Sequence, residues 1–332
     1  MRALVFRDKQ LQLEKNYPNP EPVSGEALIR VSQIGICNTD VEIVQGYMNF
    51  QGVLGHEFVG VVERVYHQKG ASVDSSLEGK RVVGDINAAC RRPGCWYCDQ
   101  GMHTHCPNRT TLGIVNRDGA FAEYLQLPVE NLHLVPDSVS DEEAVFVEPL
   151  AANFEILEQL HLRPTSSVLV LGDGKMGQLA ARVLALSGCE LIMVGKHKEK
   201  LALAASYISE AFVLEDATSF HLPGNRRVDF VVECTGSAQG LELAARLCRP
   251  RGTVVLKSTV ANKSELSLAP FVIDEIRVQG SRCGPFLPAL RVLQQRLIDV
   301  KPLISARYSL DEGLAAFEKA TQPGVLKVLV KP

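Results

Sequence analysis

Residues 168–177 read Val168-Leu-Val-Leu171-Gly172-Asp-Gly174-Lys-Met-Gly177, and this stretch decides the fold of the second half of the chain. Four apolar residues precede three glycines in GxGxxG spacing, and a segment with helical spacing runs on to Ser187. A strand, a glycine-rich turn and a helix in this order are typical of a dinucleotide-binding unit. The glycines allow a tight turn, a close approach of pyrophosphate to the backbone, and close packing of helix on strand. We therefore expect a dinucleotide cofactor to contact Gly172, Gly174, Lys175, Met176 and Gly177. The alternative interpretation is that these glycines only form a turn in some other α/β fold.

The segments around this turn alternate between strand and helix patterns. Strands are predicted at Val168–Leu171, Leu191–Val194, Val228–Glu233 and Thr253–Leu256. Helices are predicted at Ala151–Leu162, Gly177–Ser187, Glu199–Ser206 and Gly240–Leu247. Alternation at this spacing predicts an α/β domain with a doubly wound parallel sheet. The tail is less regular, with helices expected at Leu287–Ile298 and Leu310–Ala320 and a last strand at Val325–Val330.

The first ~150 residues have a different texture, since short apolar runs alternate with turn signals. Such runs are Ala27–Val31, Gly60–Val65, Arg81–Val83 and Phe121–Leu127. This pattern predicts an all-β module. The start, from Met1 to Phe6, is predicted to be a strand rather than a signal peptide, because it has neither a long apolar core nor a small-residue cleavage site.

Length and composition bound the remaining possibilities. The 332 residues suggest two domains of ~100–200 residues each. With a net charge of −3, nothing points to a nucleic-acid partner or an anionic membrane surface. The apolar runs are far shorter than the ~20 residues that a membrane span needs. We therefore expect a cytoplasmic protein with no nucleic-acid or membrane partner.

The end of the second predicted strand bears on the choice of cofactor. NAD sites place an Asp or Glu there to bind the ribose hydroxyl, but here Gly195, Lys196, His197 and Lys198 follow the strand. With no carboxylate in the run and two lysines, Lys196 and Lys198, to hold a 2′-phosphate, the sequence favours NADP, with NAD as the alternative. The competing interpretation is that the basic run only begins a solvated helix.

Four of the nine cysteines lie within 17 residues, at Cys90, Cys95, Cys98 and Cys106. Without a secretory context, such a cluster favours a metal over disulfides. Four thiolates can hold one tetrahedral zinc, and all-cysteine zinc sites are closed and structural. The alternatives are a redox switch or thiols without a ligand.

Further candidate ligands are spread along the first half of the chain. They are Cys37, His56, Glu57 and Glu148. No spacing rule connects them, and an isolated histidine is more often a satisfied core or surface residue than a ligand. The residues alone leave this site open.

Together these motifs resemble the zinc-containing medium-chain dehydrogenase/reductase superfamily. The matching segments run in order through nearly the whole chain: Gly35-Ile-Cys-Asn-Thr-Asp40, Gly55-His-Glu-Phe-Val-Gly60, the cysteine cluster, Gly119-Ala-Phe-Ala-Glu-Tyr124, Glu148-Pro-Leu150, the GxGxxG, Glu233-Cys-Thr-Gly236 and Val325-Leu-Lys-Val328. Glu-Pro-Leu resembles the polyol (sorbitol) and threonine dehydrogenase branch.

The resemblance implies a GroES-like β domain over residues 1–147, completed by about 276–332, with a Rossmann domain at 148–275 inserted between. It implies a catalytic zinc on Cys37, His56 and Glu148, where alcohol dehydrogenase uses two cysteines and one histidine. Glu57 is an alternative ligand, Thr39 would bind the substrate oxygen, and Asp40 would orient the histidine. Lys327 matches a cation near the pyrophosphate. A homodimer or homotetramer is expected from the family.

Three positions depart from the family pattern. Cys90 lies two residues before the usual first cysteine of the cluster, where Arg92 stands; Tyr66 replaces a small residue; and Glu42 replaces the histidine that ends a proton relay. The expected activity is hydride transfer between a small alcohol or polyol and NAD(P). The alternatives are a threonine-type amino-alcohol dehydrogenase and a zinc- and cofactor-binding protein without dehydrogenase activity.

Overall fold

A computed structural model describes residues 1–66, 76–259 and 266–332. The chain divides into two compact units. Unit 1 comprises Met1–Glu148 and Phe286–Pro332, and unit 2 comprises Pro149–Pro285. Among the described residues, no helix combines the length and the apolar character needed to cross a membrane.

Unit 2 is built on a parallel sheet of six described strands in the order β13-β12-β11-β14-β15-β16. The strands are β11 (Ser167–Leu171), β12 (Glu190–Gly195), β13 (Glu210–Val213), β14 (Val228–Glu233), β15 (Cys248–Leu256) and β16 (Arg277–Gly280). The helices are α5 (Lys175–Ala185), α6 (Lys198–Ala202), α7 (Ala238–Leu247) and α8 (Ala269–Ile273), with a short 3-10 turn at Pro223–Asn225. The strand order reverses direction at β11, which is the doubly wound arrangement that the sequence predicts.

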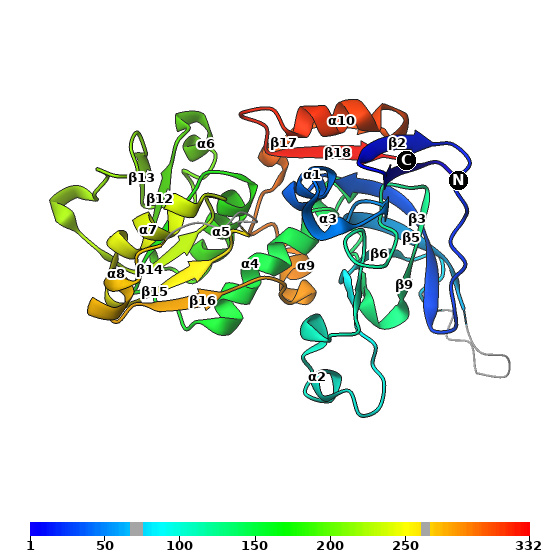
Figure 1. The fold of residues 1–332 in the computed structure, drawn as a ribbon, viewed down its shortest axis with the longest axis horizontal. Coiled ribbons are helices and arrows are strands. Elements are labelled where there is room, and N and C mark those ends of the chain that lie inside the picture. Colours follow the sequence, from blue (N-terminus) through cyan, green and yellow to red (C-terminus); the bar gives the residue numbers. More distant parts are fainter. Residues whose placement is uncertain (67–75, 260–265) are drawn as a thin grey trace. The chain divides into compact units, whose positions relative to one another are not determined.

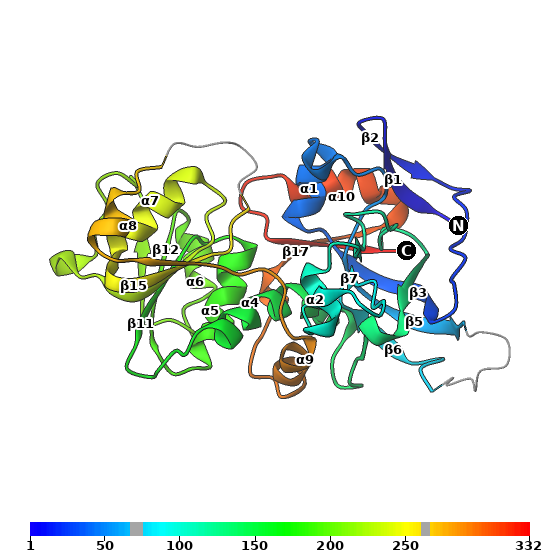
Figure 2. The same ribbon diagram turned by 60° about the horizontal axis from the view of Figure 1, so that its bottom comes forward.

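Helices lie on both sides of this sheet (Figure 2), and the side chains of its strands alternate between the two faces. Leu169 and Leu171 of β11 pack in a buried cluster with Leu243 of α7, whereas Val168 and Val170 pack in another with Leu184 of α5. Helices therefore cover both faces, and this explains why the strands are almost continuously apolar.

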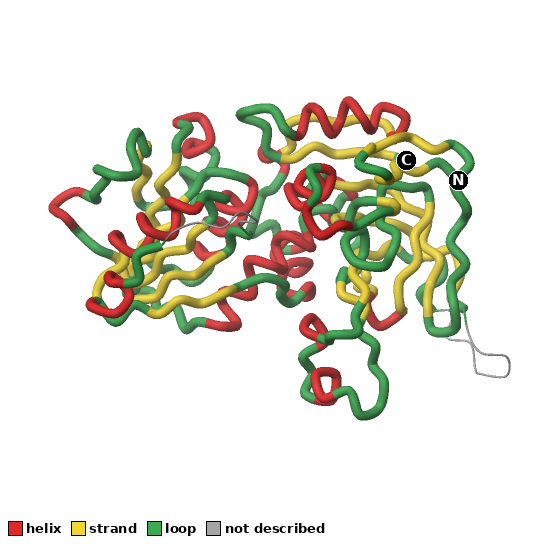
Figure 3. The backbone as a smooth tube through the Cα atoms, viewed as in Figure 1, coloured by secondary structure: helices red, strands yellow, loops and turns green. Residues whose placement is uncertain are grey.

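Unit 1 consists mostly of short strands (Figure 3). They are β1 (Ala3–Arg7), β2 (Gln10–Glu14), β3 (Glu26–Gly35), β4 (Gly52–Val53), β5 (Glu57–Val65), β6 (Arg81–Gly84), β7 (Asn87–Ala88), β8 (Thr110–Thr111), β9 (Tyr124–Pro128), β10 (Leu132–Leu134), β17 (Ile304–Ser309) and β18 (Lys327–Lys331). The α-helices are α1 (Asn38–Val44), α2 (Trp96–Asp99), α3 (Asp141–Ala144), α9 (Phe286–Gln294) and α10 (Gly313–Ala320). Short 3-10 turns lie at Tyr47–Asn49, His103–His105, Val129–Asn131, Lys301–Leu303 and Leu310–Glu312. Helix α4 (Val147–Gln159) carries the chain from unit 1 into unit 2.

Strand β3 is the centre of unit 1. It pairs with β5, β9 and β18, in a sheet that continues to β6 and β10 on one side and to β17 on the other. Ala27, Ile29 and Val31 alternate into the core, as their apolar spacing predicts. The C-terminal strand β18 lies between β3 and β17. Figure 1 shows α10 running beside β17 and β18. The end of the chain thus completes a core that its beginning starts.

A loop between β7 and β8 extends from the β domain and carries α2 (Figure 1). It holds only two short helical turns, and Trp96 and Tyr97 in it are exposed. We call residues 90–106 the cysteine lobe. Few apolar side chains of this lobe are buried, so its order needs another source of stability.

The structure moves one expected domain boundary and contains elements that the sequence did not suggest. The return to unit 1 lies at Phe286, ten residues after the expected 276, because β16 pairs in parallel with β15 and extends the sheet of unit 2. The sequence also did not reveal β13, β16, β17 or α1. Strands β13, β16 and β17 lie at or next to the edges of their sheets and are only partly buried, so their apolar signal is weak.

Candidate active site and metal centre

Cys37 lies where strand β3 gives way to helix α1. It is the N-cap of α1 and keeps part of its surface accessible. Its backbone N–H donates to Asp40 Oδ2 at 2.8 Å, and Gly55 N–H donates to Oδ1 of the same carboxylate at 3.2 Å. Asp40 is fully buried, so these two hydrogen bonds hold both the thiol and the segment before His56 in place.

His56 and Glu57 stand at the start of β5, and both are buried. Oδ1 of Asp40 lies 3.2 Å from Nδ1 of His56, an ion-pair contact without the angle of a hydrogen bond. Glu57 forms a buried ion pair with Lys327 of β18, and the Lys327 ammonium also lies 5.5 Å from the ring centre of Phe146. Lys327 therefore holds Glu57, a partner that the sequence did not suggest for either residue.

The ligand atoms of Cys37, His56 and Glu57 all lie within 4.8 Å of one another. Glu148 is outside this group but close enough to interact electrostatically with His56 and Glu57. It begins the first turn of α4 and keeps part of its surface accessible. Of the four candidate ligands, the structure thus brings three into one cluster and places Glu148 beside them. Thr39, in the first turn of α1, is half-buried.

The electrostatics of this cluster favour a bound cation. Surrounding atoms desolvate Glu148 and raise the pKa of its carboxyl to about 7, with His56 and Lys327 opposing the effect and Glu57 and Asp85 adding to it. Burial lowers the pKa of His56, but Asp40 and Cys37 outweigh it and leave this pKa well above its usual range. Glu148 and His56 both bind a proton more tightly than usual, because anionic donors are concentrated in a poorly solvated place. A metal ion can replace those protons, so the donor set fits one.

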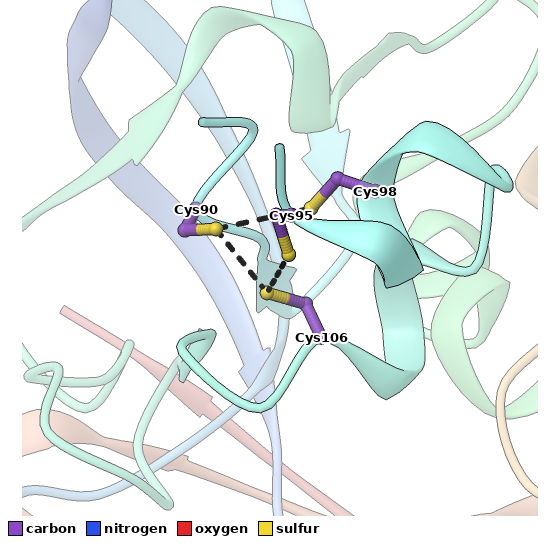
Figure 4. Close-up of side chains that lie close together, drawn as sticks. All are labelled: Cys90, Cys95, Cys98 and Cys106. Carbon is purple, nitrogen blue, oxygen red and sulfur yellow. Dashed lines mark hydrogen bonds between the residues drawn. The ribbon is translucent and has the colours of Figure 1, made fainter. Parts of the chain in front are cut away.

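The four cysteines of the lobe converge, as Figure 4 shows. Sγ of Cys90 lies 3.5 Å from that of Cys106 and 3.9 Å from that of Cys98, and Cys95 lies 3.9 Å from Cys106. Tetrahedral zinc with Zn–S bonds of about 2.3 Å separates its sulfurs by roughly 3.8 Å. None of the four forms a disulfide. Cys90 belongs to this cluster despite its unusual position in the sequence.

The thiols of the lobe differ in their affinity for protons. Burial raises the pKa of Cys106, but backbone N–H groups of Cys90 and Asn108 and neighbouring thiols bring it down to about 6. Desolvation and hydrogen bonds to the other thiols raise the pKa of Cys98 to about 12. Cys106 is therefore more acidic than Cys98.

The glycine-rich turn of unit 2 joins β11 to α5. Gly172 has a φ of +115°, a left-handed conformation that favours glycine. A Cβ on Gly177 would lie 1.9 Å from the Gly172 carbonyl oxygen, so no larger residue fits there. A cavity of about 210 Å³ opens at this turn, lined among others by Gly172, Gly174, Gly195, Lys196 and His197. This cavity lies where the glycine-rich sequence predicts a dinucleotide to bind.

Other expected cofactor contacts are placed differently. Lys198 begins α6 and is not among the residues lining this cavity, nor are Lys175, Met176 and Gly177. The Met176 sulfur accepts a hydrogen bond from Asn153.

A carboxylate does lie beside the end of β12, contrary to the expectation from the sequence. The run after β12 contains no carboxylate, but Asp173 of the glycine-rich turn brings one there. Its Oδ2 accepts a hydrogen bond from His197 N–H at 2.6 Å. The sequence did not reveal this because the contact joins residues 24 positions apart.

Comparisons with known proteins agree with the fold. Residues 23–137 match the alcohol dehydrogenase GroES-like domain, and residues 176–296 match the zinc-binding dehydrogenase family. The chain is 30% identical to D-arabitol-phosphate dehydrogenase of Enterococcus avium, over 94% of this chain and 91% of that protein. It is 28% identical to sorbitol dehydrogenase of Bacillus subtilis (strain 168), over 99% and 96%.

Two solved structures resemble the chain over its whole length. One is a putative zinc-binding dehydrogenase from Sinorhizobium meliloti 1021 bound to NADP, with a TM-score of 0.88 and 29% identity, covering 100% of this chain and 99% of that one. The other is a short chain alcohol dehydrogenase from Escherichia coli CFT073 complexed with NADH, with a TM-score of 0.88, 26% identity and the same coverage.

This chain belongs to the zinc-containing medium-chain dehydrogenase/reductase superfamily, a family of oxidoreductases. The expected fold, a Rossmann domain with a GroES-like β domain, and the enzyme class are confirmed.

Proposed function

We propose that the chain is a zinc-dependent dehydrogenase that oxidises a hydroxyl group of a small alcohol or polyol, or reduces the corresponding carbonyl, with a nicotinamide dinucleotide. The observation that carries this proposal is the cluster of Cys37, His56 and Glu57 with Glu148 beside it. A thiolate, an imidazole and a carboxylate are a donor set that suits zinc. The names of the relatives, sorbitol and arabitol-phosphate dehydrogenase, support polyols as the substrate class.

Cys37, His56 and Glu148 would hold the catalytic zinc. Cys37 and Glu148 both keep part of their surface accessible, whereas Glu57 is buried and paired with Lys327. Glu57 is thus the less available of the two carboxylates and stays the alternative ligand. When bound, zinc polarises the substrate oxygen and lowers the pKa of an alcohol.

The neighbouring side chains position the site and move the proton. Asp40 holds the Cys37 backbone and faces His56, as carboxylates behind metal-bound histidines do. Thr39, two residues after Cys37, would accept the alcohol proton while it passes its own hydroxyl proton on. Oxidation releases one proton and one hydride, and the hydride passes to the nicotinamide while the carbinol carbon becomes a carbonyl.

The cysteine lobe would hold a second, structural zinc on Cys90, Cys95, Cys98 and Cys106. The sulfur separations of 3.5–3.9 Å support it. Since the lobe buries little apolar surface, ligation would supply the order that packing does not.

For the cofactor we propose NADP. Gly195 and Lys196 line the cavity beside the glycine-rich turn, and a cation there can hold a 2′-phosphate. A retained difference of ~1.4 kcal/mol gives a tenfold preference. The NADP-bound relative supports this choice, and the NADH-bound relative marks NAD as the alternative.

The test is a substrate panel on protein whose zinc content has been measured. Simple alcohols, polyols, polyol phosphates and threonine are each assayed with NAD and with NADP. We expect two zinc ions per chain and the highest kcat/KM for a polyol or its phosphate with NADP. Faster turnover of threonine would favour an amino-alcohol dehydrogenase. Full zinc and cofactor binding with no turnover of any substrate would favour a homologue without dehydrogenase activity.

A further inference from the structure

The carboxylate of Asp173 is the one acidic group lining the cavity at the glycine-rich turn, among the described residues. Only 9% of its side chain is exposed. Oδ2 accepts hydrogen bonds from the His197 backbone N–H at 2.6 Å and pairs with the His197 ring nitrogen Nδ1 at 3.0 Å. These contacts direct the Asp173 side chain toward the end of β12.

The missing side chain of Gly195 explains why Asp173 can lie there. A Cβ on Gly195 would lie 2.5 Å from Cβ of Asp173 and 2.6 Å from its Oδ2. The aspartate therefore occupies the space that a side chain at position 195 would fill. In dinucleotide sites, that position at the end of the second strand carries the Asp or Glu that binds the ribose hydroxyls.

We propose that Asp173 supplies this carboxylate from the glycine-rich turn, and that its charge limits the preference for NADP over NAD. The inference rests on the proposed nicotinamide cofactor and concerns the residue that sets its selectivity.

The charges around the cavity define what Asp173 does. Lys196 lines the same cavity and attracts a 2′-phosphate, whereas Asp173 repels one. A carboxylate oxygen can accept two hydrogen bonds, and Oδ1 has only a 3.2 Å contact with His197 Nδ1. Oδ1 can thus still accept from a ribose hydroxyl of NAD. The backbone N–H of His197 donates whatever the charge of the ring, so the carboxylate stays in place.

The experiment compares the wild type with Asp173→Asn. Dissociation constants are measured calorimetrically for NADPH and NADH, and for 2′,5′-ADP and 5′-AMP, which report on the adenosine end without turnover. We expect Asp173→Asn to raise the preference for NADPH over NADH at least tenfold, with the same direction for the two fragments. Glu199→Gln is the matched control: it removes a charge from the exposed start of α6 outside the cavity, and should change the ratio less than twofold.

A second pair of variants moves the carboxylate from the turn to the strand. Asp173→Gly, which also removes the Cβ that a side chain at position 195 would meet, should show the same increase as Asp173→Asn. Adding Gly195→Asp to Asp173→Gly should reverse it. Ratios are taken within each variant, so a general loss of affinity cancels.

The possible failures are distinguishable. A wild type that binds both cofactors, with an unchanged ratio in both Asp173 variants, would overturn this inference alone. A wild type that binds neither cofactor nor fragment would overturn the proposed function as well.

Discussion

The cysteine lobe and the Cys37 cluster are both groups of side chains that could hold a metal ion, but the chain builds them in opposite ways. The lobe takes four thiols from 17 consecutive residues and places them on a loop with exposed aromatic side chains. The Cys37 cluster takes its members from the end of β3 and the start of β5, with Glu148 from the start of α4, and buries His56 and Glu57.

The difference concerns what holds each group together. In the Cys37 cluster the fold fixes the donors before any metal arrives: Asp40 ties two segments, and Lys327 holds Glu57. In the lobe, little besides the four sulfurs is available to fix the donors in place. We therefore expect loss of a ligand to affect chemistry in the cluster and stability in the lobe.

The largest expected effect is on turnover in Cys37→Ser. Hydroxyl is a much poorer zinc ligand than thiolate, so we expect kcat/KM to fall by more than about 1,000-fold. Loss of a residue that only hydrogen-bonds to a metal ligand costs ~10–100-fold, and loss of the ligand itself should cost more. The melting temperature should change by less than about 3 °C, since Asp40 still holds the segment. Steady-state kinetics and calorimetry check this, with Cys189→Ser in unit 2 as the control. Substantial activity in Cys37→Ser would remove Cys37 from the catalytic site.

The next effect separates the two carboxylates. Glu148→Gln should lower kcat/KM by more than about 100-fold and weaken catalytic zinc, because it removes one ligand of three. Glu57→Gln should spare most of the zinc but lower the free energy of unfolding by about 3 kcal/mol, since Lys327 would lose its buried partner. Zinc analysis and denaturation of both variants decide between them. If Glu57→Gln loses the zinc and Glu148→Gln keeps it, Glu57 is the third ligand.

The smallest effect on chemistry is expected in the lobe. Cys98→Ser should lose one zinc of two and lower the melting temperature by roughly 5–10 °C, with kcat/KM reduced less than tenfold below that temperature. Cys90→Ser should behave in the same way, because its sulfur is as close to its neighbours as the others are. A Cys90→Ser protein with two zinc ions and wild-type stability would show that only three cysteines matter.

The sequence by itself determined what is local. The GxGxxG turn, the alternating strands and helices of unit 2, and the four cysteines of the lobe are patterns among near neighbours in the chain, where spacing dictates geometry. The Cys37 site is different. It was suggested only by resemblance to a family, since no spacing rule connects positions 37, 56 and 148.

Which distant groups meet depends on the tertiary fold. It paired Lys327 with Glu57 across 270 positions, and placed Glu57 rather than Glu148 in the cluster with Cys37 and His56. It also brought the Asp173 carboxylate to the end of a strand whose own sequence contains none. These contacts depend on strand order and on the space that a glycine leaves, and neither is a property of a single segment.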